Sequence, residues 1–298
     1  MTVRTASETA GEGTAERRPP NRALPAMLGP AYLWLAVTIF LPLSAMLYFS
    51  LLTETPFGER VAAFTVQHYL DFFQKDFYQT LMLRSFRLGA EVTLYCLLLG
   101  FPCAYVLAKT IKGRWREALF LLIILPFWSN ALVRVFSWTM VLRGNGVLET
   151  AVNWVFPDFG SLGLMFTYPA IIIGLVHSYL PYMILTTYIS LQAIDDSLIE
   201  AARSLGAGRL TTLRRVVIPL ALPGMAAGSI LIFVPVVGSF MEPRILGGRQ
   251  GTFIGTVIED QFTAVFNWPL GAALSFIMLG FVLLIFALSA PVLRRAGS

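Results

Sequence analysis

Six long apolar runs constrain the fold of this chain more than any other feature of its sequence. Each offers about 20 or more mostly apolar residues, enough for a helix to cross the ~30 Å hydrocarbon core of a bilayer. Every backbone polar group in that core needs a partner within the protein, and continuous runs of this length meet the requirement as α-helices. The runs cover residues 29–52, 88–108, 118–142, 163–190, 216–240 and 271–293. We therefore predict an all-α integral membrane protein with six transmembrane helices.

The composition supports the same conclusion. Of the 298 residues, 56% are hydrophobic and only 13% are charged, whereas a soluble domain carries about a quarter charged residues. Residues 1–28 are polar and lack apolar periodicity, so we expect a disordered N-terminal tail. Residues 29–295 are expected to form one six-helix domain in the lipid bilayer.

Lysine and arginine are distributed unevenly between the two sides of the predicted membrane domain. Fourteen of the 22 lie in the tail, in the connections 109–117 and 195–219, and at the C-terminus, and seven lie in the connections of the opposite side. Cytoplasmic connections carry the excess of positive charge, so both termini are predicted to be cytoplasmic. The same asymmetry accounts for the net charge of +5, and no nucleic-acid partner is predicted.

The connection 195–219 is predicted to contain a short helix. Asp195, Asp196 and Ser197 supply capping oxygens, and Ser197-x-x-Glu200 has the spacing of a capping box. A helix of about nine residues is marginal in water, so it must dock on something. Two partners remain open: its own bundle with the lipid headgroups, or a soluble cytoplasmic protein that receives its apolar stripe in a groove. The stripe consists of Leu198, Ile199, Ala202 and Leu205, and Gly206 is the expected left-handed stop.

The same connection resembles the EAA motif of permease subunits in ATP-binding-cassette (ABC) importers. Glu200-Ala201-Ala202 is followed by Gly206 and then by Val216-x-Ile218-Pro219, at the spacing of that motif and before the fifth of six spans. The resemblance implies a type I ABC importer (MetI-like) permease fold with a cytoplasmic coupling helix at about 197–206. It also implies that this helix docks in a groove of the ATPase subunit. The residues implied in coupling are Glu200, Ala201, Ala202, Leu205, Gly206 and Pro219.

The resemblance extends over most of the chain, from about 30 to 295, and is to the spermidine/putrescine importer group. It is carried by the segments LLLGFPCAYVLA (97–108), LPFWSNALVRVFSW (125–138), GNGVLE (144–149), GSFMEPRILGG (238–248) and IGTVIEDQF (254–262). In one departure, Ser239 stands where members often have an acidic residue, and Glu242 follows three residues later. The implied solute is a polyamine such as spermidine or putrescine, or a related opine-like or other amino-acid derivative.

Four residues are candidates for the translocation pathway: Trp128, Arg134, Trp138 and Glu242. Arg134 lies deep in the third run, where a charge is unfavourable by about 2.5–3.5 kcal/mol on insertion scales. It is therefore expected either to line the pathway or to pair with Glu91. The two tryptophans either stack on an ammonium group or pack in an interfacial belt, and Glu242 is either part of an outer gate or a solvated loop charge.

No residues for ATP hydrolysis are recognisable in the sequence. It contains no GxxxxGK[ST] phosphate loop, and His68 and His177 are isolated, so we predict a non-catalytic subunit without a metal or cofactor of its own. The resemblance implies a second, different permease chain, two ATP-binding subunits that hold ATP and Mg²⁺, a periplasmic solute-binding protein and a bacterial inner-membrane location. The alternative is an ion-coupled secondary transporter, but the sequence lacks the internal repeats typical of that class.

Overall fold

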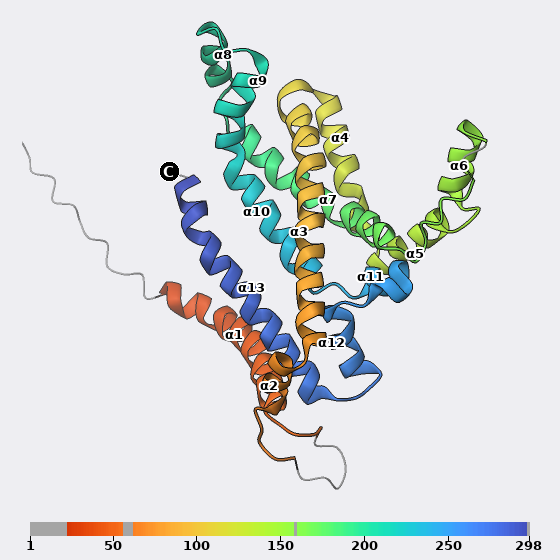
Figure 1. Cartoon of the computed structure of the whole chain (residues 1–298). Coiled ribbons are helices and arrows are strands. Elements are labelled where there is room, and N and C mark those ends of the chain that lie inside the picture. Colours follow the sequence, from red (N-terminus) through yellow and green to blue (C-terminus); the bar gives the residue numbers. More distant parts are fainter. Residues whose placement is uncertain (1–22, 56–61, 158–159, 297–298) are drawn as a thin grey trace, which may run out of the picture. The chain divides into compact units, whose positions relative to one another are not determined.

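The computed structural model describes residues 23–55, 62–157 and 160–296. Their regular structure is helical, with one isolated bridge between Leu52 and Phe64. The elements are α1 (Ala23–Ser50), α2 (Gln67–Gln74), α3 (Asp76–Tyr105), η1 (Val106–Thr110), α4 (Arg114–Ile124), η2 (Leu125–Trp128), α5 (Ala131–Leu142), α6 (Val147–Val155), α7 (Tyr168–Gln192), α8 (Asp196–Ser204), α9 (Arg209–Thr212), η3 (Leu213–Val217), α10 (Ile218–Val237), α11 (Met241–Gly247), η4 (Gly248–Gly251), α12 (Ile254–Thr263) and α13 (Trp268–Ala296) (Figure 1).

The predicted number of spans is reached only if one bent pair of helices counts as a span. Within the described residues, five helices are long and apolar enough to cross a membrane, and a sixth candidate is broken. This candidate joins Arg114–Trp128 to Ala131–Val155 at an angle of 98°. The expectation of one continuous helix over 118–142 is therefore wrong. Pro126 removes a backbone donor, and the Asn130 side chain accepts from Leu132 N at 2.8 Å, so a new helix begins there.

The chain divides into two units, the first of which ends at Met46. Helix α1 begins at Ala23, so the predicted tail of 1–28 extends too far into the chain. Residues 1–22 of that tail lie outside the described residues. The large apolar side chains of this unit are exposed, Trp34 to 72% and Phe40 to 66%. Such a helix needs lipid or another chain around it.

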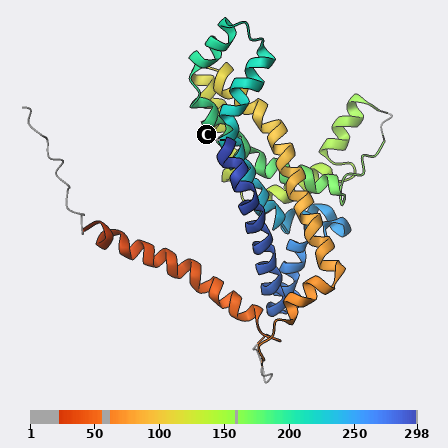
Figure 2. The same ribbon diagram turned by 60° about the vertical axis from the view of Figure 1, so that its left-hand side comes forward.

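The core of the second unit is formed by α3, α7 and α10. These three helices contact one another more extensively than any other group in the described part of the chain, and Figures 1 and 2 show them side by side. Their shared buried cluster includes Val92, Leu175 and Ile232. Glycines allow a close approach: a Cβ at Gly224 would collide with Thr186 O and Ser190 Oγ of α7. Small residues at such contacts are typical of packed membrane helices.

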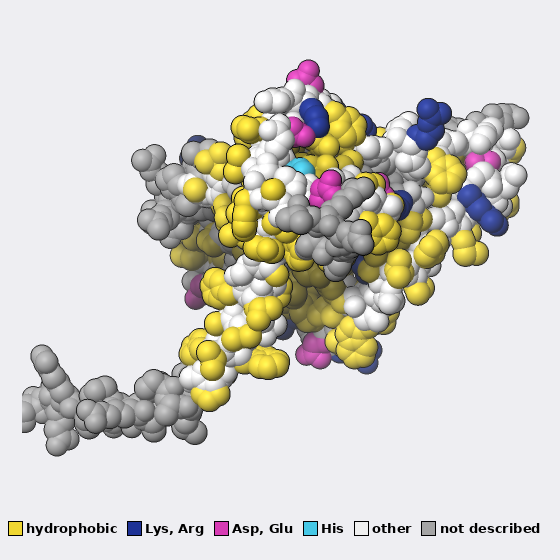
Figure 3. Space-filling model, turned by 90° about the horizontal axis from the view of Figure 1, so that it is seen from below, with side chains coloured by type: hydrophobic (Ala, Val, Ile, Leu, Met, Phe, Trp, Pro, Cys, Tyr) yellow, Lys and Arg dark blue, Asp and Glu magenta, His cyan; other side chains and the backbone are white. Residues whose placement is uncertain are grey.

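The remaining surface is strongly apolar. Seen from below, broad areas of hydrophobic side chains separate scattered charged groups (Figure 3). Leu83, Leu122 and Val133 are each more than 60% exposed. Apolar areas of this extent are not stable in water, so they require lipid or partner chains.

The close approach of α7 and α10 gives a first prediction. We expect Gly224→Leu to force these helices apart and to destabilise the folded chain by about 1–3 kcal/mol, the usual cost of overpacking. The matched control is Gly280→Leu in α13, where a Cβ meets nothing within 4 Å. The measurement is thermal unfolding in detergent, monitored by labelling of the buried Cys96 thiol in a chain whose exposed Cys103 is replaced by Ser. Equal transition temperatures for the two variants would contradict the packing argument.

Candidate functional site

The predicted helix of the 195–219 connection is α8. It begins at Asp196 and its N-cap is Asp195, whose side chain accepts a hydrogen bond from Ser197 N at 2.9 Å. The expected capping box between Ser197 and Glu200 is therefore wrong. Asp195 is the capping residue, since its carboxylate accepts from the N–H of Ser197. This hydrogen bond lowers the pKa of Asp195 below its ordinary value.

The C-terminal end of α8 is closed as the sequence predicts. Gly206 adopts φ +85°, in the left-handed region. Its N–H donates to Arg203 O at 2.9 Å, and Ala207 N donates to Ala202 O at 3.0 Å. This pair of bonds is a Schellman motif, which ends the helix sharply. Farther along, Pro219 lies in the first turn of α10, as expected.

Helix α8 buries one apolar side chain and exposes most of the others. Ile199 is buried in an apolar cluster with Leu191, Ile194 and Val217. Leu198 is 48% exposed and Leu205 is 89% exposed, and Glu200 and Ala201 are also exposed. The predicted stripe therefore divides into an inward anchor and an outward apolar face. A capped helix with such a face is suited to docking in a groove.

A polar cluster lies near the bend of the broken span. Arg134 donates to Pro126 O at 3.2 Å, and its Nε is buried without a hydrogen-bond partner. The Trp138 ring packs on the His177 ring of α7 with centroids 5.2 Å apart. Tyr179, also on α7, interacts electrostatically with both Arg134 and Glu242. Arg134 and Trp138 lie on α5 and Glu242 lies on α11, and both of these helices pack against α7.

Glu242 is buried rather than solvated. It is 9% exposed, and Ser239 Oγ donates to its Oε2 at 2.9 Å. Ser239, the departure noted in the sequence, is therefore bonded to the carboxylate three residues later. Trp128 does not join this cluster, because it is 90% exposed at the bend.

The sequence missed His177 and Tyr179, and it assigned the wrong partner to Arg134. Glu91 pairs with Arg87, one helical turn away, at 2.7 Å, and accepts from Tyr168 Oη at 2.7 Å. The expected pair between Arg134 and Glu91 is therefore wrong. A single Tyr or His in an apolar run gives no signal of its own, since the sequence does not show which side chains of another helix it meets.

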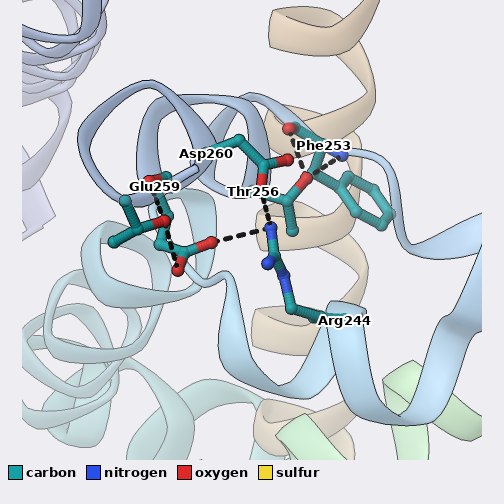
Figure 4. A network of polar contacts seen from close by, with 6 residues as sticks. Arg244, Phe253, Thr256, Glu259 and Asp260 are labelled. Carbon is teal, nitrogen blue, oxygen red and sulfur yellow. Dashed lines mark hydrogen bonds and ion pairs between the residues drawn. The ribbon is translucent and has the colours of Figure 1, made fainter. Parts of the chain in front are cut away.

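The segment 238–263 contains α11, η4 and α12 and is called the loop that carries Glu242. It is fixed by an ionic network. Arg244 of α11 contacts Glu259 at 2.7 Å and Asp260 at 2.5 Å, both on α12; Figure 4 shows its guanidinium directed at the two carboxylates. The hydrogen bond to Asp260 raises the pKa of Arg244. Thr256 closes the start of α12 by donating to Phe253 O at 2.8 Å. In the described residues, no group of three or more His, Cys, Asp or Glu is placed to hold a metal ion.

Comparison with known proteins identifies the family. Residues 99–296 match the family model described as "Binding-protein-dependent transport system inner membrane component". The spermidine/putrescine transport system permease protein PotB of Escherichia coli (strain K12) is 36% identical over 88% of this chain and 96% of its own length. The inner membrane ABC transporter permease protein YdcU of the same strain is 29% identical over 91% of this chain and 88% of its own length.

Solved structures agree on the fold. A chain of a bacterial ABC transporter involved in import of the acidic polysaccharide alginate has a TM-score of 0.71 at 18% identity, over 92% of this chain and 95% of its own. A chain of the MetNI methionine ABC transporter has a TM-score of 0.54 at 17% identity, over 74% of this chain and 99% of its own. The alternative of an ion-coupled secondary transporter is not supported. This chain belongs to the family of binding-protein-dependent transport system inner membrane components, and it is a multi-pass permease subunit of an ABC importer.

Proposed function

We propose that this permease forms half of the translocation pathway and is driven by a separate ATPase through α8. The observation that carries this proposal is the construction of α8, which is capped at both ends, anchored by Ile199 and exposed at Leu198 and Leu205. Glu200 lies on the exposed part of the same helix. A groove on the ATPase would bury the apolar side chains and pair with the charge.

The proposed assembly contains this chain, a second and different permease, two ATP-binding subunits and a periplasmic solute-binding protein. ATP and Mg²⁺ are held by the ATP-binding subunits. The excess of lysine and arginine near α8 supports a cytoplasmic location for α8 and for both termini. The opposite end of the second unit, with α11 and α12, then faces the periplasm (Figure 1).

In this proposal the translocation pathway opens alternately to the two sides of the membrane, and the movement is driven from the α8 end. Closure of the two ATPase subunits on ATP draws the coupling helices together, and the membrane halves turn outward. Hydrolysis releases the ATPase subunits and returns the halves to the inward state. Such rigid-body rearrangements suit packed helices, which shift between discrete arrangements rather than deform continuously.

The proposed solute is a small nitrogenous compound. The similarity to permeases named for spermidine and putrescine supports a polyamine, as does the buried carboxylate of Glu242. A carboxylate and aromatic faces are suited to bind ammonium groups. Arg134, on the helix α5 that packs against α11, favours a second candidate, an amino-acid derivative that carries a carboxylate as well as an amine.

The overall assignment is tested by purifying the chain from its native membrane in mild detergent. We expect an ATPase and a second permease to accompany it, as identified by mass spectrometry. Calorimetric titration of the cognate binding protein with polyamines and with amino-acid derivatives then identifies the solute class. A chain that transports solute by itself would overturn the proposal.

Changes in α8 should separate ATP hydrolysis from transport. We expect Glu200→Lys or Gly206→Pro to lower uptake by about tenfold or more, equivalent to ~1.4 kcal/mol of docking free energy, while insertion in the membrane persists. The reason is that the first reverses an exposed docking charge and the second cannot adopt φ +85°. Uptake is measured in vesicles, with Glu117→Lys, an exposed charge reversal on α4, as control. Normal uptake by both α8 variants would remove α8 from the coupling step.

The Glu242 carboxylate should recognise an ammonium group of the solute. We expect Glu242→Gln to reduce putrescine uptake by roughly tenfold or more, since hydrogen bonds to charged groups contribute about 1.5–3 kcal/mol. Asp76→Asn is the matched control, an exposed carboxylate in the first turn of α3. Uptake of 4-aminobutyrate, which carries a carboxylate in place of one amine, is measured in parallel. An unchanged rate for both solutes would show that Glu242 does not contact the cargo.

A further inference from the structure

Lys109 joins three elements at the base of α8. This residue belongs to η1, the widened turn that follows α3. Its ammonium group donates to Ile194 O, just beyond α7, at 2.6 Å, and to Asp196 Oδ1, the first residue of α8, at 2.6 Å. The Lys109 side chain is only 9% exposed, whereas the Asp196 side chain is 70% exposed. A buried ammonium needs such partners, because an unpaired buried charge is strongly unfavourable.

The backbone around Lys109 is built to place it there. In η1 the N–H of Ile111 bonds to Val106 O at 3.0 Å, five residues back, which is a π-type bond. Pro102, one turn earlier in α3, has no backbone N–H to donate. A π turn inserts one residue and re-aims the side chains that follow, and such turns occur frequently at functional sites. Here the re-aimed side chain is the one that reaches α8.

The hydrogen bond from Lys109 also stabilises the charged form of its partner. It lowers the pKa of Asp196 below the ordinary value of 3.8. A carboxyl whose folded-state pKa is depressed keeps its interaction above the ordinary pKa and loses it as the pH falls through the lowered value. The ion pair is therefore intact throughout the physiological pH range.

The opposite ends of the same two helices hold the loop that carries Glu242. Ser85 of α3 accepts from Ile254 N at 3.1 Å. Tyr168, the first residue of α7, donates through its N–H to Gln250 Oε1 at 2.9 Å. Between these contacts and Lys109, α3 and α7 are packed along a buried apolar cluster. If α8 is firmly attached to α3 and α7, a movement of α8 would therefore reach this distant loop.

We infer that Lys109 is a positioning residue for transport, which fixes the coupling helix α8 to the α3–α7 pair so that ATP-driven movement of α8 reaches the loop 238–263. Lys109 contacts neither the ATPase nor the solute in this role. It acts through Asp196 and Ile194, and its loss leaves α8 held by Ile199 but free to tilt. The inference rests on the proposed function, because it needs an ATPase that moves α8.

The experiment uses the complete importer complex in proteoliposomes, with Cys103→Ser to remove an exposed thiol. A fluorophore is attached at Arg249→Cys, an exposed position in the distant loop. The readouts are the ATPase rate and the fluorescence change on addition of ATP. The variants are Lys109→Met, Lys109→Arg and Asp196→Asn, and the control is Lys112→Met, an exposed lysine of the same connection.

We expect Lys109→Met to keep the ATPase subunits bound and active but to reduce the fluorescence response by about tenfold or more, equivalent to ~1.4 kcal/mol of coupling. Lys109→Arg restores the response, because a guanidinium can make both hydrogen bonds. Lys112→Met behaves as the unsubstituted complex does. A purely stabilising role would instead lower the amount of complex and leave its response per molecule unchanged.

The outcomes separate this inference from the proposed function. If no ATPase accompanies the unsubstituted chain, the proposed function fails and the inference fails with it. If the ATPase is present and Lys109→Met responds normally, or the unsubstituted complex shows no response, only the inference is overturned. If Lys109→Met does not assemble, Asp196→Asn decides, because it weakens the pair at an exposed carboxylate and leaves the carbonyl contact intact. A full response in Asp196→Asn would then overturn the role of Lys109.

Discussion

The absence of water in the bilayer core is the constraint on which the rest of this structure depends. Each backbone N–H and C=O there must be bonded within the protein, so straight α-helix is the default and every irregularity needs a local cause. The irregularities of the described spans lie close to prolines: η1 follows Pro102, η3 precedes Pro219 and the bend follows Pro126. These three irregularities thus lie near positions where a backbone donor is already missing, although Pro181, Pro223 and Pro235 lie inside continuous α-helix.

This constraint also explains how much of the fold was predictable from sequence. Hydropathy sums over about 20 residues, so it located the apolar runs but could not detect a 98° bend inside one of them. The bend depends on Pro126 together with Asn130. The same residues in a continuous helix would give an equal hydropathy sum. Helix α8 was predicted from its stop at Gly206 and its capping oxygens. The choice between Asp195 and Ser197 as N-cap was missed, because it depends on backbone angles one residue apart.

The candidate site was predictable as residue types but not as an arrangement. Arg134, Trp138 and Glu242 stand out in an apolar sequence because charged and amphipathic residues are costly there. Their common neighbours on α7, His177 and Tyr179, do not stand out. The expected pair between Arg134 and Glu91 did not form because Glu91 has a partner on its own helix. Arg87 lies four residues before Glu91, and this spacing brings the two side chains together without any tertiary contact.

The separation of polar groups between the two ends of the second unit has a mechanical consequence. The middle of α3, α7 and α10 is held by apolar contacts and by glycines that bring backbones together. Close-packed interiors have low compressibility and transmit strain. In the proposed function, movement applied at the α8 end would therefore be passed through the middle, and its effect would depend on how firmly each end is attached. Lys109 attaches one end, and Ser85 and Gln250 attach the other. In the proposed function these polar contacts at the two ends, rather than rearrangement of the apolar core, carry the change of access.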